Sequence, residues 1–247
     1  SVPAGTAGSG TTITLQAKDA QGNNRTNATG ITAVAASVTG ANTATPSVTN
    51  NGNGTYTLTY TPTASGTDNV AITMDVGGGA VAISGSPYSS VVSAGAVSNF
   101  LVEAAGGGAI GAQTAGTSFN VKVTARDANN NTATAFTGTV TFTSTGTLSA
   151  GTGPSAAFTA GVLSSHALTI TNTGSWTVTA TRTGNAEAGT SSSFTVGAGA
   201  ASAAQSTATV PAGTAGSVTT ITVQAKDANG NNRTTTSGVV AASITGA

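Results

Sequence analysis

The sequence has no cysteine, few charged or aromatic residues and no long apolar run. Without cysteine, the chain can hold neither a disulfide scaffold nor a cysteine-ligated zinc ion. Charged residues make up 6% of the 247 residues and the net charge is zero, whereas roughly 25% charged residues is usual in globular domains. A basic surface for nucleic acid is therefore excluded, as is a strongly acidic surface. No apolar stretch approaches the roughly 20 residues of a membrane helix, so we expect no membrane insertion.

Small and weakly polar residues make up most of the chain instead, chiefly Thr, Ser, Ala, Gly, Val and Asn. With 38% hydrophobic residues, the composition argues against disorder, which pairs low hydrophobicity with high charge. Residue 1 is Ser and no signal peptide is visible, so we expect a mature or excised part of a longer protein.

One stretch occurs three times, and each copy ends in a basic residue, Asp and Ala. The copies are residues 12–20 (TITLQAKDA), 120–128 (NVKVTARDA) and 220–228 (TITVQAKDA). The steps between the basic residues are 126 − 18 = 108 and 226 − 126 = 100 residues. About 100 residues is the usual size of an antiparallel β-sandwich. The repeats therefore predict tandem domains of that kind.

Each copy alternates apolar and polar residues, which indicates a strand with one buried face. We therefore predict an all-β chain of tandem immunoglobulin-like β-sandwiches joined by short linkers. The predicted domains are residues 1–95, 96–199 and 200–247. The last is an incomplete copy of the first, because residues 209–247 match only residues 1–41.

The first domain has the pattern of seven short strands separated by turn residues, with no helical period. A double Asn-Gly turn at residues 50–54 is a strong hairpin signal. The predicted strands lie around Val2 and at residues 12–18, 31–38, 47–49, 55–60, 69–75 and 86–92.

Residues 51–62 (NGNGTYTLTYTP) and 83–88 (ISGSPY) resemble the filamin-type immunoglobulin repeat. That family carries a Gly-Asp-Gly-Thr-Tyr turn and strand and a closing Gly-Ser-Pro-Phe segment. Asn53 stands here in place of Asp, and Tyr88 in place of Phe. The resemblance implies a fold and a stalk-like role for residues 1–95, without actin binding. In filamins, partner peptides add to an exposed sheet edge, and the corresponding strand here is 31–38.

The second domain lacks this motif and resembles the Thr-rich immunoglobulin-like modules of large bacterial surface proteins. We expect the strands at 165–171 and 176–182 to form a hairpin-like pair. The predicted strands are residues 99–103, 119–125, 139–143, 165–171, 176–182 and 193–196.

The apolar positions of these strands predict two separate cores and one uncovered face. The first core is expected to contain Leu15, Leu58, Tyr60, Val70 and Ile72. The second is expected to contain Val121, Val123, Phe142, Leu168, Trp176 and Val178. Three strands with one apolar face need a cover. In the third repeat we expect a neighbouring copy, or continuation of the chain, to cover Ile221, Val223, Ala225, Val240 and Ile244.

Each repeated stretch leads into an Asn-rich turn that begins at Asp19, Asp127 or Asp227. These turns resemble half of a calcium loop. Calcium requires several oxygen ligands, yet each turn has one carboxylate and no distal Glu. We predict that each Asp caps backbone amides of its own turn and that no metal binds there.

Other residues are weak candidates for chemistry. The loop Gly106–Gly111 matches G-x-G-x-x-G, but a strand, not a helix, is expected after it. His166 is the only histidine, and one His does not build a zinc site. We expect Trp176 to be a core anchor and not a carbohydrate platform. Lys18 and Lys122 are out of phase with the apolar faces, which argues against isopeptide bonds. We therefore predict no catalytic, cofactor-binding or metal-binding residues.

Tandem repetition, short linkers and the lack of a catalytic constellation favour a structural role. We predict a non-enzymatic segment of a repetitive extracellular or cell-surface protein of bacterial type, forming a stalk or filament. Copies of itself are the expected partners, head to tail or laterally, because molecules without net charge associate readily. Two alternatives stay open: an adhesion, carbohydrate- or protein-binding module with a host or cell-surface ligand, and an accessory region of a secreted enzyme. We expect no nucleic-acid partner and no cofactor.

Overall fold

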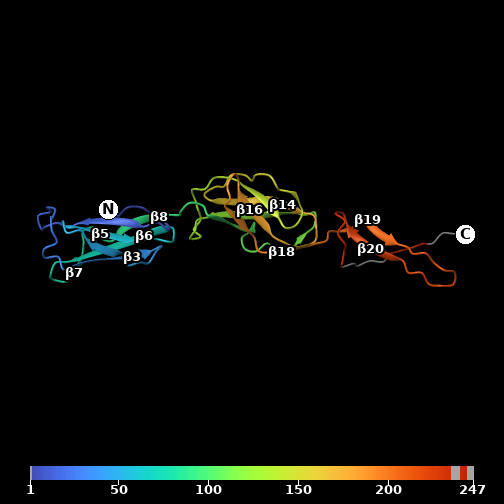
Figure 1. Ribbon diagram of the computed structural model, residues 1–247, viewed down its shortest axis with the longest axis horizontal. Coiled ribbons are helices and arrows are strands. Elements are labelled where there is room, and N and C mark those ends of the chain that lie inside the picture. Colours follow the sequence, from blue (N-terminus) through green and yellow to red (C-terminus); the bar gives the residue numbers. More distant parts are fainter. Residues whose placement is uncertain (1, 235–239, 244–247) are drawn as a thin grey trace. The chain divides into compact units, whose positions relative to one another are not determined.

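A computed structural model describes residues 2–234 and 240–243 (Figure 1). The elements in these residues are β-strands, as an all-β chain requires. Within them no helix is long and apolar enough to cross a membrane. By contacts the chain forms two compact units: residues 1–99 with 125–136, and residues 100–124 with 137–247. The all-β, tandem immunoglobulin-like fold is confirmed.

The first repeat is a sandwich of two sheets, ordered β1-β8-β6-β3 (with β7 on β6) and β2-β5-β4. β1 runs parallel to β8, while the other pairs are antiparallel. β7 was not predicted from the sequence. The first strand lies at Gly5–Thr6 and not around Val2 as predicted, while the other predicted strands of this repeat are present. The bounds are β1 Gly5–Thr6, β2 Thr11–Gln16, β3 Ala33–Gly40, β4 Ser47–Asn50, β5 Thr55–Tyr60, β6 Gly66–Asp75, β7 Ala80–Ala82 and β8 Tyr88–Ser93.

The first core lies between these two sheets, since the inward residues of both are almost fully buried. Leu58 and Val70 are 0% exposed. Of the predicted core residues, Leu15 alone is only partly buried, and it packs against the cluster from its rim. The other buried members are Ile13, Ala17, Ala36, Val38, Tyr56, Tyr60 and Ile72.

The second repeat contains sheets ordered β13-β14-β11-β9, β12-β16-β17 and β10-β18-β15. The bounds are β9 Asn99–Ala104, β10 Gln113–Thr114, β11 Ser118–Arg126, β12 Val140–Ser144, β13 Leu148–Ala150, β14 Val162–Ile170, β15 Gly174–Trp176, β16 Val178–Arg182, β17 Ala188–Thr190 and β18 Phe194–Gly197.

The predicted pairing of residues 165–171 with 176–182 is wrong. β14 pairs with β11 and β13, and the second segment divides at Thr177 into two strands of different sheets. β15 pairs with β18, whereas β16 pairs with β12 and β17. A sandwich requires such a switch of sheets when consecutive strands face each other across the core.

The second core contains five of its six predicted members: Val121, Val123, Phe142, Leu168 and Val178 are at most 2% exposed. Trp176 is the exception and is only partly buried. Its indole lies over the backbone of Gly146 and Gly174, where an added Cβ would approach the ring within 2.8 and 2.5 Å.

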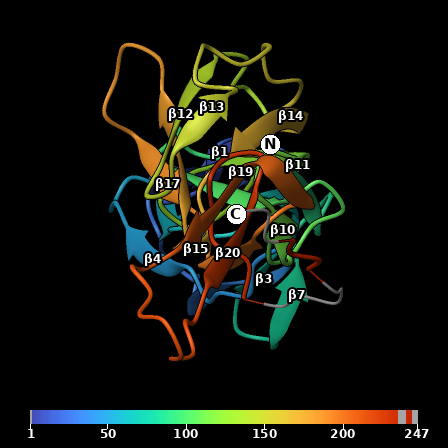
Figure 2. The same cartoon turned by 90° about the vertical axis from the view of Figure 1, so that its right-hand side faces the viewer.

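The described part of the third repeat is a two-stranded sheet of β19 (Ala201–Thr209) and β20 (Thr222–Asp227). The two strands run side by side in both views (Figure 1, Figure 2). The cover that we expect from a neighbouring copy, or from continuation of the chain, stays a prediction. Ile221 is 39%, Val223 45% and Val240 67% exposed, and Ala225 is half-buried. Ile244 lies outside the described residues.

Candidate functional site: the aspartate turns

The turn after β11 closes on the carboxylate of Asp127. One oxygen, Oδ1, accepts the N–H groups of Asn129 at 2.8 Å and Asn131 at 2.9 Å. The other, Oδ2, accepts the side-chain amide of Asn131 at 2.9 Å. Asn130 takes a positive φ of 66° at the tip, a conformation that Asn tolerates better than most residues. The predicted capping turn is therefore present.

The same turn binds the repeat that precedes it. Asp127 Oδ2 accepts the N–H of Gly95 at 2.8 Å. The Asn131 side chain donates to the Thr63 carbonyl at 2.8 Å and accepts the N–H of Ser65 at 2.9 Å. One amide side chain thus satisfies a donor and an acceptor of the loop between β5 and β6.

The turn after β20 makes the same set of contacts with the second repeat. Asp227 Oδ2 accepts the N–H of Gly199 at 2.9 Å. The Asn231 side chain donates to the Thr171 carbonyl at 2.7 Å and accepts the N–H of Thr173 at 3.2 Å. We call the pair of turns at Asp127–Asn131 and Asp227–Asn231 the junction turns.

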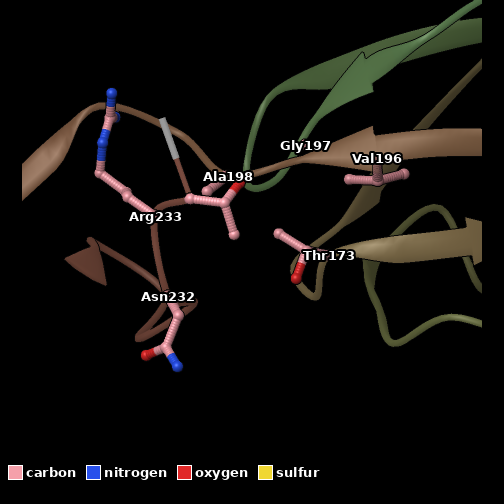
Figure 3. Close-up of a pocket in the computed structure, with 7 residues that line it drawn as sticks. Thr173, Val196, Gly197, Ala198, Asn232 and Arg233 are labelled. Carbon is pink, nitrogen blue, oxygen red and sulfur yellow. The ribbon is translucent and has the colours of Figure 1, made fainter. Parts of the chain in front are cut away.

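Figure 3 shows the surroundings of the second junction turn. A hollow of about 300 Å³ lies between Thr173, Val196 and Gly197 on one side and Asn232 and Arg233 on the other. Its lining contains no carboxylate, so it offers no anchor for a metal ion.

The turn at Asp19 has the same internal bonds but no external ones among the described residues. Asp19 Oδ1 accepts from Gln21 and Asn23 at 3.0 and 2.8 Å, and Oδ2 accepts the Asn23 side chain at 3.0 Å. Its residues are exposed, whereas Asp127 is 1% and Asp227 0% exposed.

The loop that receives Asn131 is held from its other side by Asn42. The side-chain oxygen Oδ1 of Asn42 accepts the N–H groups of Thr63 and Ala64, both at 2.9 Å. Its side-chain amide, Nδ2, donates to the Ala64 carbonyl at 2.8 Å. Asn42 in turn binds the buried carboxylate of Asp68 through its backbone N–H at 2.8 Å. Hydrogen bonds within the first repeat therefore hold the loop that Asn131 contacts.

In the second repeat, Trp176 holds the corresponding loop, between β14 and β15. Its indole N–H donates to the Asn172 carbonyl at 3.0 Å, and Asn172 lies between the two residues that bind Asn231. Asn172 Oδ1 also accepts the N–H of Thr147 at 2.6 Å. The partial exposure of Trp176 follows from its position at this loop and not in the core.

Hydrogen bonding keeps the junction carboxylates ionised. Burial acts to raise the pKa of Asp127, but the donors from the Asn131 side chain and from the N–H groups of Gly95, Asn131 and Asn129 outweigh it, so the pKa lies below 3.8. The pKa of Asp227 is lowered against burial by the corresponding donors. Ionised oxygens form the stronger hydrogen bonds.

N–H donors point at both carboxylate oxygens of Asp127, which argues against a metal at this turn. Within residues 2–234 and 240–243, no group of three His, Cys, Asp or Glu side chains is placed to hold an ion.

The remaining candidates lie apart from the junctions. His166 stacks on Phe142 with ring centroids 4.4 Å apart and contacts the Gly151 carbonyl through Nε2 at 3.0 Å. Lys122 lies 3.8 Å from Glu103, and Lys18 is exposed. The loop Gly106–Gly111 is followed by the predicted strand β11 and not by a helix, with the short strand β10, which was not predicted, between them.

Comparisons with known proteins agree with the two resemblances. Residues 1–89 match the family model of the Filamin/ABP280 repeat. No curated protein sequence matches the chain.

Three similar solved structures represent three kinds of protein. The FdeC adhesin of Escherichia coli is 28% identical with a TM-score of 0.48, over 93% of this chain and 72% of that one. Domains 1–6 of the surface layer protein SbsC are 20% identical with a TM-score of 0.29, over 87% and 26%. An endo-fucoidan hydrolase of glycoside hydrolase family 107 is 14% identical with a TM-score of 0.31, over 80% and 27%. The chain is thus an immunoglobulin-like repeat segment similar to segments of adhesins and surface-layer proteins.

Sequence reasoning found the three Asp turns but missed their outer partners. Asn131 and Asn231 lie 100 residues apart, and each follows its Asp by four residues. This pattern predicts the turn but not the contact that the Asn side chain makes with the preceding repeat. Asn42 and Asp68 were missed entirely, because their partners lie 21 to 26 residues away along the chain.

Proposed function

We propose that the chain is a structural stalk segment of a repetitive extracellular surface protein, in which each junction turn fixes one repeat to the repeat before it. The observation that carries the proposal is the recurrence of one hydrogen-bond set at both junctions. Thr63 and Ser65 bind Asn131, and Thr171 and Thr173 bind Asn231. The corresponding residues of the two sets are 108 positions apart. Domains that move freely on flexible linkers would not share such a recurring set of hydrogen bonds.

A non-catalytic role agrees with the composition of the surface. All ten aromatic residues lie in the described part of the chain, and none of them is exposed. Carbohydrate platforms present exposed aromatic faces, so this feature favours a stalk over a sugar-binding module. Weak association between copies, head to tail or lateral, is part of the proposal.

The test is the stiffness of the first junction. Because the chain has no native cysteine, Thr12→Cys and Asn120→Cys provide the only two labelling sites for spin labels. We expect a narrow distance distribution by pulsed electron resonance that broadens in Asn131→Ala. The matched control Asn23→Ala removes the same side chain from the turn without external partners and leaves the distribution unchanged. A distribution equally broad in all three chains would overturn the proposal.

A second candidate function is binding of an extended peptide at β3. This strand is an edge of its sheet, and a hollow of about 230 Å³ beside it is lined by Ile31, Val34, Val48 and Tyr56, among others. The test is selection from a library of extended peptides. Peptides whose binding survives Val34→Pro, which places a residue without N–H in the edge strand, would count against this site.

A further inference from the structure

We propose that Asn53 is a site of spontaneous covalent modification, where the side chain cyclises onto the backbone nitrogen of Gly54 and is converted to aspartate or isoaspartate. The reaction needs water and no other reactant. The inference goes beyond the proposed function and does not depend on it, because it concerns the chemistry of one turn within the first repeat.

Deamidation of an asparagine begins when the backbone nitrogen of the next residue attacks the side-chain carbon Cγ. Here the bond from Gly54 N to Asn53 Cγ closes a five-membered succinimide ring. The N–H proton passes through solvent to the side-chain nitrogen, which leaves as ammonia. Water then opens the ring at either of its two carbonyls and gives aspartate or isoaspartate. A glycine in the next position favours the attack, since it has no Cβ to hinder the approach.

The availability of the attacking nitrogen separates three Asn-Gly steps in the chain. The steps begin at Asn51, Asn53 and Asn229. The N–H of Gly52 donates to Asn50 Oδ1 at 2.9 Å, and the N–H of Gly230 donates to the Asp227 carbonyl at 3.1 Å. The N–H of Gly54 donates to no acceptor among the described residues. Of the three attacking nitrogens, two must therefore break a hydrogen bond before they react, and that of Gly54 need not.

The side chain of Asn53 folds back over its own backbone. Its Oδ1 accepts the backbone N–H of Thr55 at 3.1 Å and the Thr55 hydroxyl at 2.6 Å. This Asx turn closes a ring that contains both Asn53 Cγ and Gly54 N, so the two reacting atoms are held near each other. The two donors also stabilise the negative charge that develops on Oδ1 during the attack, as an oxyanion hole does. Asn51, in contrast, is held through its nitrogen, which donates to the hydroxyls of Thr55 and Thr57 at 2.9 and 3.0 Å.

The fold itself requires glycine at position 54. Gly54 has a positive φ of 80°, and an added Cβ would lie 2.0 Å from the carbonyl oxygen of Arg25. Gly54 is buried at this contact, whereas Asn53 is exposed to the water that takes part in the reaction. The reactive dipeptide is therefore a consequence of how this turn packs against the backbone at residue 25.

The two products have different effects on the turn. Aspartate keeps an oxygen that accepts from Thr55 and adds one negative charge to a chain whose net charge is zero. Isoaspartate also adds one carbon to the backbone between residues 53 and 54. That carbon displaces the Gly54 carbonyl from its donors, the Ala17 N–H at 2.9 Å and Gln16 Nε2 at 3.2 Å. Isoaspartate therefore weakens the contact between the end of β2 and the start of β5.

The experiment compares the three Asn-Gly steps within one chain, folded and unfolded. The native chain is incubated at mildly alkaline pH, and the same chain in guanidinium chloride gives the rates that local sequence sets. Peptide mass spectrometry follows the mass gain at each asparagine, and electron-transfer fragmentation separates aspartate from isoaspartate. We expect folding to slow conversion at Asn51 and Asn229 about tenfold, since each must break a hydrogen bond. Conversion at Asn53 should be at least as fast in the folded chain as in the unfolded one.

A pair of variants tests the two donors to Asn53 Oδ1. Thr55→Val keeps the β-branched shape and removes the hydroxyl, so conversion at Asn53 should slow about threefold to tenfold. Thr57→Val is the matched control, because the Thr57 hydroxyl contacts Asn51 and not Asn53, and it should leave the rate at Asn53 unchanged. Amide spectra confirm that each variant is folded.

Two results would overturn the proposal. One is that folding slows conversion at Asn53 as much as it slows conversion at Asn51 and Asn229. The other is that Thr55→Val and Thr57→Val give the same rate at Asn53 in the folded chain.

Discussion

The first and third repeats share nearly the same sequence yet bury opposite parts of it. Ile13 is 2% exposed in the first repeat, and its counterpart Ile221 is 39% exposed. The Asp turns show the reverse, because Asp19 is exposed and Asp227 is 0% exposed. Ile13 belongs to a core that includes Leu58 of β5 and Val70 of β6, and Asp227 accepts the N–H of Gly199, which lies between β18 and β19. Local sequence therefore sets strand and turn, while burial depends on segments that are distant along the chain.

The largest difference is expected from truncating the matched isoleucines. Ile13→Ala should destabilise the first repeat by about 2–5 kcal/mol, since it leaves a cavity in a closed core. Ile221→Ala should cost less than about 1 kcal/mol, because the side chain is already open to water. Hydrogen exchange resolved by repeat is the measurement. Equal costs would mean that the apolar face of the third repeat is covered in solution.

Removing a junction carboxylate should have the next largest effect. Asp227→Ala leaves the N–H groups of Gly199, Asn229 and Asn231 without their acceptor, which should cost about 1–3 kcal/mol. Asp19→Ala should cost less, because water replaces the lost acceptor at an exposed turn. Urea denaturation of the two variants decides the matter, and a larger loss for Asp19→Ala would break the comparison.

Trp176→Phe should have a smaller effect, confined to the second junction. The ring remains over Gly146 and Gly174, but the donor to the Asn172 carbonyl is lost, at a cost of about 1 kcal/mol. We expect faster amide exchange at Thr173 and Asn231, with β12 and β16 unchanged. A uniform loss of protection through the second repeat would show that Trp176 supports the core instead.

Acid should loosen the junctions gradually. The pKa values of Asp127 and Asp227 are lowered in the folded chain, so their contribution is fully present above the ordinary value of about 4 and is lost as pH falls through the folded pKa. Amide exchange at Gly95 and Gly199 should therefore speed up below about pH 4, beyond the intrinsic effect of pH. In Asp127→Asn that extra change should disappear at Gly95 and persist at Gly199.

Adding a calcium chelator should have no effect on stability, which makes it the smallest effect in this series. The junction carboxylates already accept N–H donors on both oxygens, so we expect no ion to contribute to the folded state. The melting temperature should stay the same with and without the chelator. A fall of several degrees would show that an ion binds the native chain, because such binding raises stability.

Much of the strand pattern could be predicted because it is local. Alternation located β2, β5 and β11, and the Asn-Gly turn located the β4–β5 hairpin. The short strands β7, β10, β13 and β17 have two or three residues each, too few for a period to show. The hairpin expected around Trp176 failed because adjacent segments that face each other across a core look the same in sequence as a pair in one sheet.

The sequence by itself determined the repeat length, the strands with one apolar face and the Asp turns, since each depends on residues within a few positions of one another. Tertiary structure alone decided which turns become junctions. The partners of Asn131 lie 66 and 68 residues away, and those of Asn231 lie 58 and 60 residues away. The turn at Asp19, in the first repeat, has the same local chemistry but lacks these partners among the described residues. A hydrogen-bonding side chain acquires a role only when folding brings a complementary backbone group within reach.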